Sequence, residues 1–501
     1  MKAILAKIFA KYIVKKDENW INNPFETQEK IFLKLIEQAK NTEFGKDHHF
    51  DKIKSYEDFK KYVPVNDYEG LRAYFDKMAS GKSDVLWPGK PIYLAKTSGT
   101  TSGTKYIPLT KESIPFHINS ARNALLHYIN ETGNAKFLNG KMIFLQGSPI
   151  LEDKNGLKFG RLSGIVAHYV PKYLQKNRMP SWETNCIEEW ETKVDEVVKE
   201  TMPENMTLIS GIPPWLIMYF ERLLQASGKE NIQSLYKDLQ LMVTGGVNYE
   251  PYRDKVNQLI GRNIDCIQTY PASEGFIAYQ NSQQEEDLLL LLNNGMFYEF
   301  IPVNEFHNDN PSRISIKDVK VGVDYVLILN TNAGLWGYNI GDTVRFTSTN
   351  PYKIVVSGRI KHFTSAFGEH VIAHEVEQAL QKTLEKYPAS VNEFTVAPQV
   401  NPSTGLPFHE WFIEFENYPK QLDLFAKELD NQMRKQNVYY DDLIAGNILR
   451  ELVLTPINKD GFQAYMKSVG KLGGQNKVPR LANDRKIADE FYNLKLTNNI
   501  Q

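Results

Sequence analysis

The chain has 501 residues and a formal net charge of −1, with 42% hydrophobic and 24% charged residues, which is typical of a soluble globular protein. This balance of charge excludes the basic footprint of a nucleic-acid-binding protein. The two cysteines form no C-x-x-C pair, which excludes a disulfide framework and indicates a reducing compartment.

The N-terminal segment MKAILAKIFAKYIVKK is predicted to form an amphipathic helix, with Ile4, Ile8, Phe9 and Tyr12 near one face. Lysines interrupt its apolar residues and no small-residue cleavage site follows, so a signal peptide is not expected. The longest apolar run, Leu288 to Leu292, is too short to span a bilayer. We therefore expect a cytoplasmic protein with neither a membrane nor a nucleic acid as partner.

A segment rich in hydroxyl groups and glycine follows a short predicted strand, Ile92 to Ala95. It reads Thr97-Ser98-Gly99-Thr100-Thr101-Ser102-Gly103-Thr104-Lys105. Its glycines let backbone N–H groups converge, its hydroxyls can donate, and its lysine adds charge, so the segment suits an anion such as phosphate. It is not the P-loop of ATPases, because the second glycine comes one residue early and a threonine separates it from the lysine. Taken alone, the segment is equally compatible with a solvated surface loop.

Short apolar strands then alternate with helices along the chain. The strands are predicted at Met142–Leu145, Leu208–Gly211, Leu241–Thr244 and Ile264–Gln268, with helices over Phe116–Tyr128 and from about Trp215. This alternation predicts an α/β fold with mostly parallel sheets and flanking helices. Gly245-Gly246 and Thr269-Tyr270-Pro271-Ala272-Ser273-Glu274 follow two of the strands, at the place where open α/β sheets bind ligands.

The later part of the chain indicates a second, smaller domain. A strand at Tyr325–Leu329 leads to a glycine-rich stretch that ends at Asp342, where the aspartate could simply stabilise a turn. We place a large N-terminal domain at residues 1–358, a hinge at 359–362 and a small α+β C-terminal domain at 363–501. The predicted elements of the C-terminal domain are helices at 371–384 and 421–435 and strands at 394–400, 410–415 and 451–454.

Four of these elements occur in a fixed order: the hydroxyl-rich segment, Gly245-Gly246, the segment around Tyr270 and Glu274, and Tyr338-Asn339-Ile340-Gly341-Asp342. This order resembles the adenylate-forming superfamily. Within it, the chain is similar over essentially its full length to the Gretchen Hagen family of acyl-acid amido synthetases. The stretches Phe44-Gly45-Lys46-Asp47, Val63-Pro64…Tyr68-Glu69 and Gly103-Thr104-Lys105-Tyr106-Ile107-Pro108 share the resemblance.

The resemblance implies ATP and Mg²⁺ as cofactors. The residues that it assigns to the nucleotide are Thr97, Ser98, Gly99, Thr100, Thr101, Ser102, Gly103, Lys105, Gly245, Gly246, Thr269, Tyr270, Ser273, Asp342 and Arg359. Ser98, Thr100 and Thr101 would contact phosphates, and Gly245 and Gly246 would let the backbone approach the adenine.

Three further roles follow from the resemblance. Tyr270 would stack on the adenine, Asp342 would accept hydrogen bonds from the ribose hydroxyls, and Arg359 would contact ribose or phosphate. Glu274 would hold Mg²⁺ and so act in catalysis. The alternatives are a core tyrosine at Tyr270 and, for Glu274, a carboxylate that stabilises a helix N-terminus.

Near the C-terminus, Gly473-Gly474-Gln475-Asn476-Lys477-Val478-Pro479-Arg480 resembles the family's lysine-containing segment. Lys477 would then stabilise the charge that develops on the carboxylate and the α-phosphate. The alternative is a lysine of a solvated basic face.

We therefore expect an ATP-dependent ligase that adenylates a small carboxylic acid and transfers the acyl group to an amine, typically that of an amino acid. An acyl-CoA ligase and a non-catalytic ATP-binding protein are the alternatives. Two departures, Asn339 where plant members carry arginine and Pro271-Ala272-Ser273 where they carry a serine pair, predict a bacterial member and exclude any inference to plant-hormone substrates.

Overall fold

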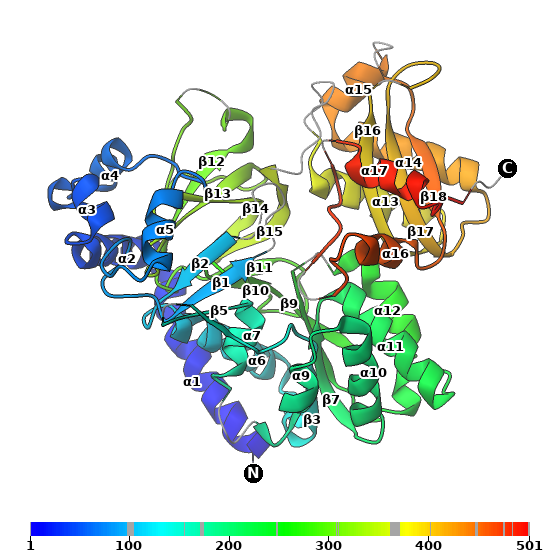
Figure 1. Cartoon of the computed structure of the whole chain (residues 1–501), viewed down its shortest axis with the longest axis horizontal. Coiled ribbons are helices and arrows are strands. Elements are labelled where there is room, and N and C mark those ends of the chain that lie inside the picture. The colour runs from blue at the N-terminus through cyan, green and yellow to red at the C-terminus, as the bar shows by residue number, and fades with distance from the viewer. Residues whose placement is uncertain are drawn as a thin grey trace. The chain divides into compact units, whose positions relative to one another are not determined.

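The computed structural model of the chain describes residues 2–97, 105–154, 156–170, 175–246, 249–306, 308, 310–360, 371–400, 402–445, 449–473, 476–482 and 484–498. It divides into two compact units, which are shown in Figure 1. The first comprises Met1–Ile212, Tyr219–Val247 and Arg262–Val355, and the second comprises Pro213–Met218, Asn248–Gly261 and Val356–Gln501. Residues 361 and 362 of the predicted hinge lie outside the described residues, so the hinge and the domain bounds stay a prediction.

The largest sheet of the described chain has eleven strands. In spatial order they are β12 (Met296–Pro302), β13 (Asp324–Thr331), β14 (Tyr338–Thr349), β15 (Tyr352–Arg359), β11 (Leu288–Leu290), β10 (Phe276–Tyr279), β9 (Asp265–Pro271), β8 (Leu241–Gly245), β7 (Met206–Gly211), β3 (Lys141–Phe144) and β6 (Arg178–Met179).

The strands from β9 to β6 are parallel, and the pairs β12–β13, β13–β14, β15–β11, β11–β10 and β10–β9 are antiparallel. The predicted α/β class is confirmed, and its parallel part is the half whose strands are joined through helices. The sheet is mixed because β9 returns directly into β10, and a tight turn can only join antiparallel strands.

Helices connect the parallel strands, as the alternating pattern predicts. The helices that begin in the first unit are α1 (Lys2–Asn22), α2 (Pro24–Ala39), α3 (Glu43–Asp47), α4 (Tyr56–Tyr62), α5 (Arg72–Ala79), α6 (Ile114–Thr132), α7 (Leu162–Ala167), α9 (Trp182–Asn185) and α10 (Trp190–Thr201). The connection between β7 and β8 is α11 (Pro213–Ser227), which begins with a proline in its first turn and ends at Gly228 in the left-handed conformation.

A second sheet of the first unit carries the hydroxyl-rich segment. Its strands are, in order, β2 (Lys105–Leu109), β1 (Tyr93–Thr97), β5 (Leu157–Gly160) and β4 (Glu152–Lys154). The predicted strand at 92–95 corresponds to β1.

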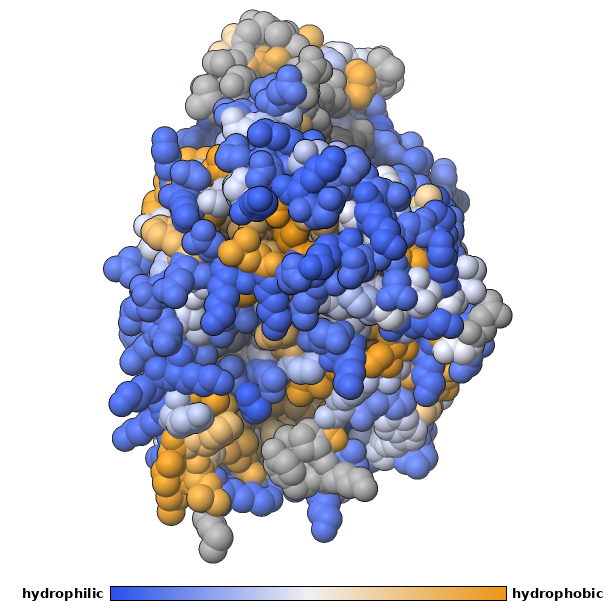
Figure 2. Space-filling view, turned by 90° about the vertical axis from the view of Figure 1, so that its left-hand side faces the viewer, coloured by the Kyte–Doolittle hydropathy of each residue, from blue (hydrophilic) through white to orange (hydrophobic). Residues whose placement is uncertain are grey.

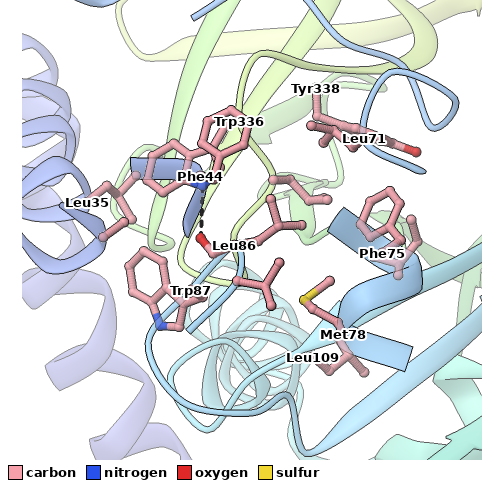
Figure 3. Close-up of a cluster of buried hydrophobic side chains, with 14 of the residues drawn as sticks. Leu35, Phe44, Leu71, Phe75, Met78, Leu86, Trp87, Leu109, Trp336 and Tyr338 are labelled. Atoms are coloured by element: carbon pink, nitrogen blue, oxygen red, sulfur yellow. Dashed lines mark hydrogen bonds between the residues drawn. The ribbon is translucent and has the colours of Figure 1, made fainter. Parts of the chain in front are cut away.

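A buried cluster joins this second sheet to the large sheet and to the N-terminal helices (Figure 3). Trp336 belongs to this cluster, stacks on Phe44 with ring centroids 6.2 Å apart, and donates its indole N–H to the carbonyl oxygen of Leu86 at 3.0 Å. Gly334 has a φ of +89°, and a Cβ there would lie 2.7 Å from the Leu86 Cβ, so only glycine allows this approach.

Helix α1 forms as predicted, but its predicted apolar face is turned to solvent. The opposite face, with Ala10, Ile13 and Trp20, is buried. Exposed apolar side chains form the outer face: Ile4 (65%), Leu5 (60%), Ile8 (62%), Phe9 (41%) and Tyr12 (63%). Figure 2 shows an apolar patch near the bottom of the view, at the height of the start of α1 in Figure 1. Across the described residues, no helix combines the length and apolarity that crossing a bilayer requires.

The second unit has a sheet with a hydrophobic cluster on each face, which confirms the predicted α+β class. Its strands are β16 (Ser390–Gln399), β17 (Phe408–Asn417) and β18 (Val453–Ile457). Its helices are α12 (Arg253–Ile260), α13 (Ala373–Lys386), α14 (Leu422–Gln436), α15 (Val438–Ala445), α16 (Gly461–Ser468) and α17 (Lys486–Asn493). Trp411 and Ile413 of β17 pack in one cluster and Phe412 in the other, as strand alternation requires.

Candidate active site

The adjacent parallel strands β8 and β9 end side by side, with Gly245 opposite Thr269. The Thr269 hydroxyl donates to the carbonyl oxygen of Thr244 at 2.8 Å. A Cβ on Gly245 would lie 2.7 Å from Thr269 Oγ1, and Gly246 has a φ of +83°. Close strand packing and the backbone conformation therefore explain both glycines without a ligand. Their predicted contact with adenine stays a prediction.

The segment after β9 is a tight hairpin turn. Ala272 and Gly275 exchange both of their backbone hydrogen bonds, at 3.0 and 3.2 Å, so Ser273 and Glu274 form its two-residue tip. Ser273 is buried and Glu274 is half-buried. Glu274 therefore lies in a turn between two strands, and the alternative that it caps a helix N-terminus is wrong.

Tyr270 and Asp342 meet although 72 residues separate them. The Tyr270 hydroxyl donates to Asp342 Oδ2 at 2.5 Å, and the two residues are only 9% and 8% exposed. In the sheet, β9 and β14 are separated by β10, β11 and β15. In a flat sheet four strand spacings would place them about 19 Å apart. The sheet must therefore curl to bring these two side chains together.

An irregularity in β14 positions Asp342 within this curl. The pairing of β13 with β14 shifts register between Val326 and Ile328. Gly341 has a φ of +89°, and its N–H donates to the Asn339 side-chain oxygen at 2.8 Å. Bulges of this kind re-aim the side chain that follows them. Asn339, which departs from the plant pattern, thus has a structural role in the turn before Asp342.

The hydroxyl-rich segment begins and ends on paired strands. Thr97 and Lys105 are register partners in β1 and β2, and the six further predicted residues between them, Ser98, Gly99, Thr100, Thr101, Ser102 and Gly103, lie outside the described residues. Lys105 Nζ lies 5.6 Å from the ring centroid of Tyr68, and the Tyr68 hydroxyl oxygen accepts the Tyr106 N–H at 3.1 Å. Tyr68 therefore supports the strand that begins with the lysine.

The segment from Asn66 to Tyr68 links this lysine to the strand of Asp342. The Asn66 N–H donates to the Gly337 carbonyl and its own carbonyl accepts the Asn339 N–H, both at 2.7 Å. The Asn66 side chain also donates to the Trp336 carbonyl at 3.2 Å. Sequence reasoning noted the neighbours of Asn66 only through the family resemblance. The sequence signal that could have identified Asn66 is an asparagine in an extended stretch that follows a proline.

Two predicted residues belong to the other end of the chain. Lys477 is exposed, and three residues later Arg480 is buried and donates to Glu393 and, at 3.1 Å, to the Phe394 carbonyl. Burial lowers the pKa of Arg480 to about 9. This arginine anchors the segment that carries Lys477. Arg359 is the last residue of β15, and its side chain lies outside the described part of the structure.

A magnesium site at Glu274 would need further ligands from the substrate. Within the described ranges, no three His, Cys, Asp or Glu residues group together as metal ligands. Mg²⁺ commonly binds through one or two carboxylates together with substrate phosphates and water. A single half-buried carboxylate at a turn therefore fits this ion.

Three family models match the chain in order. They are the GH3 family N-terminal domain at residues 14–185, the central domain at 289–359 and the C-terminal domain at 374–486. The chain belongs to the GH3 family. GH3 is the Gretchen Hagen family, so the predicted resemblance is confirmed.

Curated relatives and solved structures agree with the GH3 assignment. The chain is 22% identical to jasmonoyl–L-amino acid synthetase JAR6 of Nicotiana attenuata, covering 69% of this chain and 71% of the relative. It is 23% identical to indole-3-acetic acid-amido synthetase GH3.15 of Arabidopsis thaliana, covering 66% and 67%. The structure of AtGH3.15 acyl acid amido synthetase in complex with 2,4-DB has a TM-score of 0.81 at 16% identity, over 98% of this chain and 96% of that one.

A more distant fold neighbour is 2-hydroxyisobutyryl-CoA ligase in complex with 2-HIB-AMP. Its TM-score is 0.61 at 13% identity, over 94% of this chain and 91% of that chain. The GH3 fold is thus shared with adenylate-forming CoA ligases, as the superfamily resemblance predicts.

Changing Tyr270 to phenylalanine tests the contact at the centre of this site. We expect Tyr270→Phe to lower the free energy of unfolding by about 1–3 kcal/mol, because the buried Asp342 carboxylate loses a donor. Tyr279→Phe is the control, since Tyr279 is buried in β10 and its hydroxyl has no hydrogen-bond partner among the described residues. Denaturant unfolding of both variants measures the difference, and equal losses would contradict the expected role of the hydroxyl.

Proposed function

We propose that this GH3 chain activates a carboxylic acid as its acyl-adenylate and then forms an amide with an amino acid. The observation that carries the proposal is the match of all three GH3 domains in order, together with curated relatives that are amido synthetases. One named relative is a jasmonoyl–L-amino acid synthetase and the other an indole-3-acetic acid-amido synthetase, so a small carboxylic acid and an amino acid are the proposed substrates. The curated relatives named above come from plants, and the bacterial origin stays a prediction.

In the first half-reaction a carboxylate oxygen of the acid attacks the α-phosphorus of ATP. The new bond joins this oxygen to phosphorus, the α–β phosphoanhydride bond breaks, and pyrophosphate leaves. We propose that the Thr97–Lys105 segment holds the phosphates and that Asp342, positioned by Tyr270, accepts hydrogen bonds from the ribose hydroxyls. Mg²⁺ bound at Glu274 would neutralise phosphate charge. Lys477 would stabilise charge at the reacting carboxylate.

In the second half-reaction the amine of the amino acid attacks the acyl carbon. A carbon–nitrogen bond forms, the bond from the acyl carbon to the AMP oxygen breaks, and the amine loses a proton. We place this chemistry in the cytoplasm, since the cysteines Cys186 and Cys266 are both free thiols. A rotation about residues 359–362 between the two half-reactions is part of the proposal.

The rival function is an acyl-CoA ligase with the same first half-reaction, which the fold likeness to 2-hydroxyisobutyryl-CoA ligase allows. The deciding experiment incubates the protein with ATP, Mg²⁺ and pooled acids, adding either mixed amino acids or CoA, and identifies the products by mass spectrometry. We expect amides. Thioesters alone would favour the rival, and a protein that binds ATP but forms no AMP with any acid would be non-catalytic.

A further inference from the structure

Cationic side chains gather at the carboxyl end of β3 in the first unit, apart from the residues assigned to ATP. Arg161 lies against Gly147, where a Cβ would be 2.9 Å from Arg161 Cδ. Lys193 of α10 donates its ammonium group to the carbonyl oxygen of Gln146 at 3.1 Å. Two cations from separate elements therefore lie against neighbouring residues that directly follow the strand.

Arg178 is the first residue of β6, which pairs with β3, and it adds a third cation at the same strand end. Its guanidinium carbon lies 5.8 Å from the ring centroid of Phe144, the last residue of β3. Its Nη1 donates to the Ala167 carbonyl at 3.3 Å, and its Nε is buried without a partner. The side-chain amide nitrogen of Gln146 is also buried without a partner. These two orphaned groups are donors, and the buried Oδ1 of Asn185, a residue that Lys193 contacts, is an acceptor without a partner.

Among the described residues, no carboxylate supplies a counter-charge to these cations. Lys193 is only 4% exposed, and its other hydrogen bond goes to the Asn185 carbonyl at 2.7 Å. Throughout the described ranges, no carboxylate forms an ion pair with Arg161, Arg178 or Lys193. Burial lowers the pKa of Lys193 to about 8, the Cys186 thiol opposes this lowering and Arg161 adds to it; burial also lowers the pKa values of Arg161 and Arg178.

Burying like charges that are paired only with carbonyl oxygens is costly, so such a cluster suits an anionic ligand that supplies negative charge and further acceptors. Arginine pairs well with carboxylates, because its planar donors match the two carboxylate oxygens. The cluster lies at the edge of the parallel strands where α/β sheets bind ligands. In the sheet order only β7 separates β3 from β8, so two strand spacings, about 10 Å, separate the cluster from Gly245. A small organic acid spans such a distance.

We propose that Arg161, Arg178 and Lys193, with the amide of Gln146, bind a second carboxylate of the substrates, remote from the carbon that is adenylated. This inference rests on the proposed function. The carboxylate has two possible sources, the far end of a dicarboxylic acyl acid or the α-carboxylate of the acceptor amino acid. Both sources would present a carboxylate to the cluster, and one experiment distinguishes between the two sources.

The experiment compares kinetics for matched substrates that differ only in this group. One arm measures pyrophosphate exchange with straight-chain dicarboxylic acids against monocarboxylic acids of equal length. The other arm measures amide formation with glycine against glycinamide. We expect Lys193→Met and Arg161→Gln each to raise the KM of the carboxylate-bearing member of one arm by at least about tenfold, with little change for its uncharged partner. The arm that responds identifies the source.

Lys199→Met is the matched control, because Lys199 lies on the same helix, is exposed, and pairs with Glu196 at 2.5 Å. We expect no change in either arm for this variant. A purely structural Lys193 would instead lower the melting temperature of Lys193→Met and impair charged and uncharged substrates alike. That result, or equal KM values for charged and uncharged members in both arms, would overturn the inference while the amide-forming activity stands.

Absence of adenylation with every acid would instead refute the proposed function. Calorimetry with glutarate would then test the cluster directly, and equal binding of glutarate by the wild type and Lys193→Met would overturn the inference.

Discussion

Replacing Glu274 with glutamine is expected to abolish acid-dependent pyrophosphate release while the protein stays folded. The turn that carries Glu274 is held by backbone hydrogen bonds between Ala272 and Gly275, so the change of side chain leaves the turn in place. An amide has the shape of the carboxylate but lacks the charge that Mg²⁺ requires. Because metal neutralisation of phosphate charge supplies several kcal/mol of the barrier reduction, we expect the rate to fall by about 10²- to 10³-fold or more.

The measurement is pyrophosphate exchange, with ATP affinity in the presence and absence of Mg²⁺ as a second readout. We expect the variant to lose the Mg²⁺ dependence of ATP binding. Glu230→Gln is the control, because Glu230 is an exposed carboxylate of the same unit. Exchange at the wild-type rate in Glu274→Gln would remove Glu274 from the proposed metal site, and a large fall in melting temperature would point to a structural role.

The second large effect is expected at Arg313, in a buried ion pair of the first unit. Glu299 is fully buried and accepts two hydrogen bonds from Arg313 at 2.9 Å, one from Tyr56 at 2.9 Å and one from Asn330 at 2.8 Å. Arg313→Met leaves this carboxylate buried without its cation. We expect the free energy of unfolding to fall by about 3–5 kcal/mol, measured by denaturant titration.

Replacing Arg313 should also affect ligand binding at the candidate site. Arg313 donates to the Val63 carbonyl at 2.5 Å, and Val63 lies three residues before Asn66, where the segment that links Lys105 to the strand of Asp342 begins. We therefore expect weaker ATP binding in Arg313→Met at temperatures where the variant is still folded. Calorimetric titration with ATP measures this effect.

Two further variants separate the buried ion pair from ordinary charge effects. Arg345 pairs with Asp324 at 2.5 Å, but their side chains are 31% and 19% exposed, so Arg345→Met should cost only about 1 kcal/mol or less. Adding Glu299→Gln to Arg313→Met removes the unpaired charge and should recover part of the lost stability. If the single and double variants were equally unstable, the cost would lie in packing and not in the buried charge.

The local parts of this protein could be predicted from its sequence. The strands that lead to Gly245 and to Thr269, and the strand before the hydroxyl-rich segment, follow from short patterns of apolar, glycine and hydroxyl residues, whereas the pairing of Thr97 with Lys105 is seen only in the structure. Such patterns report which side of a strand or helix is buried and where it ends, because these properties depend on a few neighbouring residues. The family could be predicted as well, since the order of its motifs is preserved along the chain.

Only the tertiary structure decided which distant residues meet. The hydrogen bond from Tyr270 to Asp342 depends on the curl of the sheet, and the exposure of the apolar face of α1 depends on which face packs on α6. The three cations at the end of β3 come from separate elements, and nothing in their local sequence indicates that they converge with no carboxylate from the described part of the chain. Periodicity shows that a side chain is buried but not what it is buried against, because that depends on strand order and sheet curvature, which are set by the packing of the whole unit.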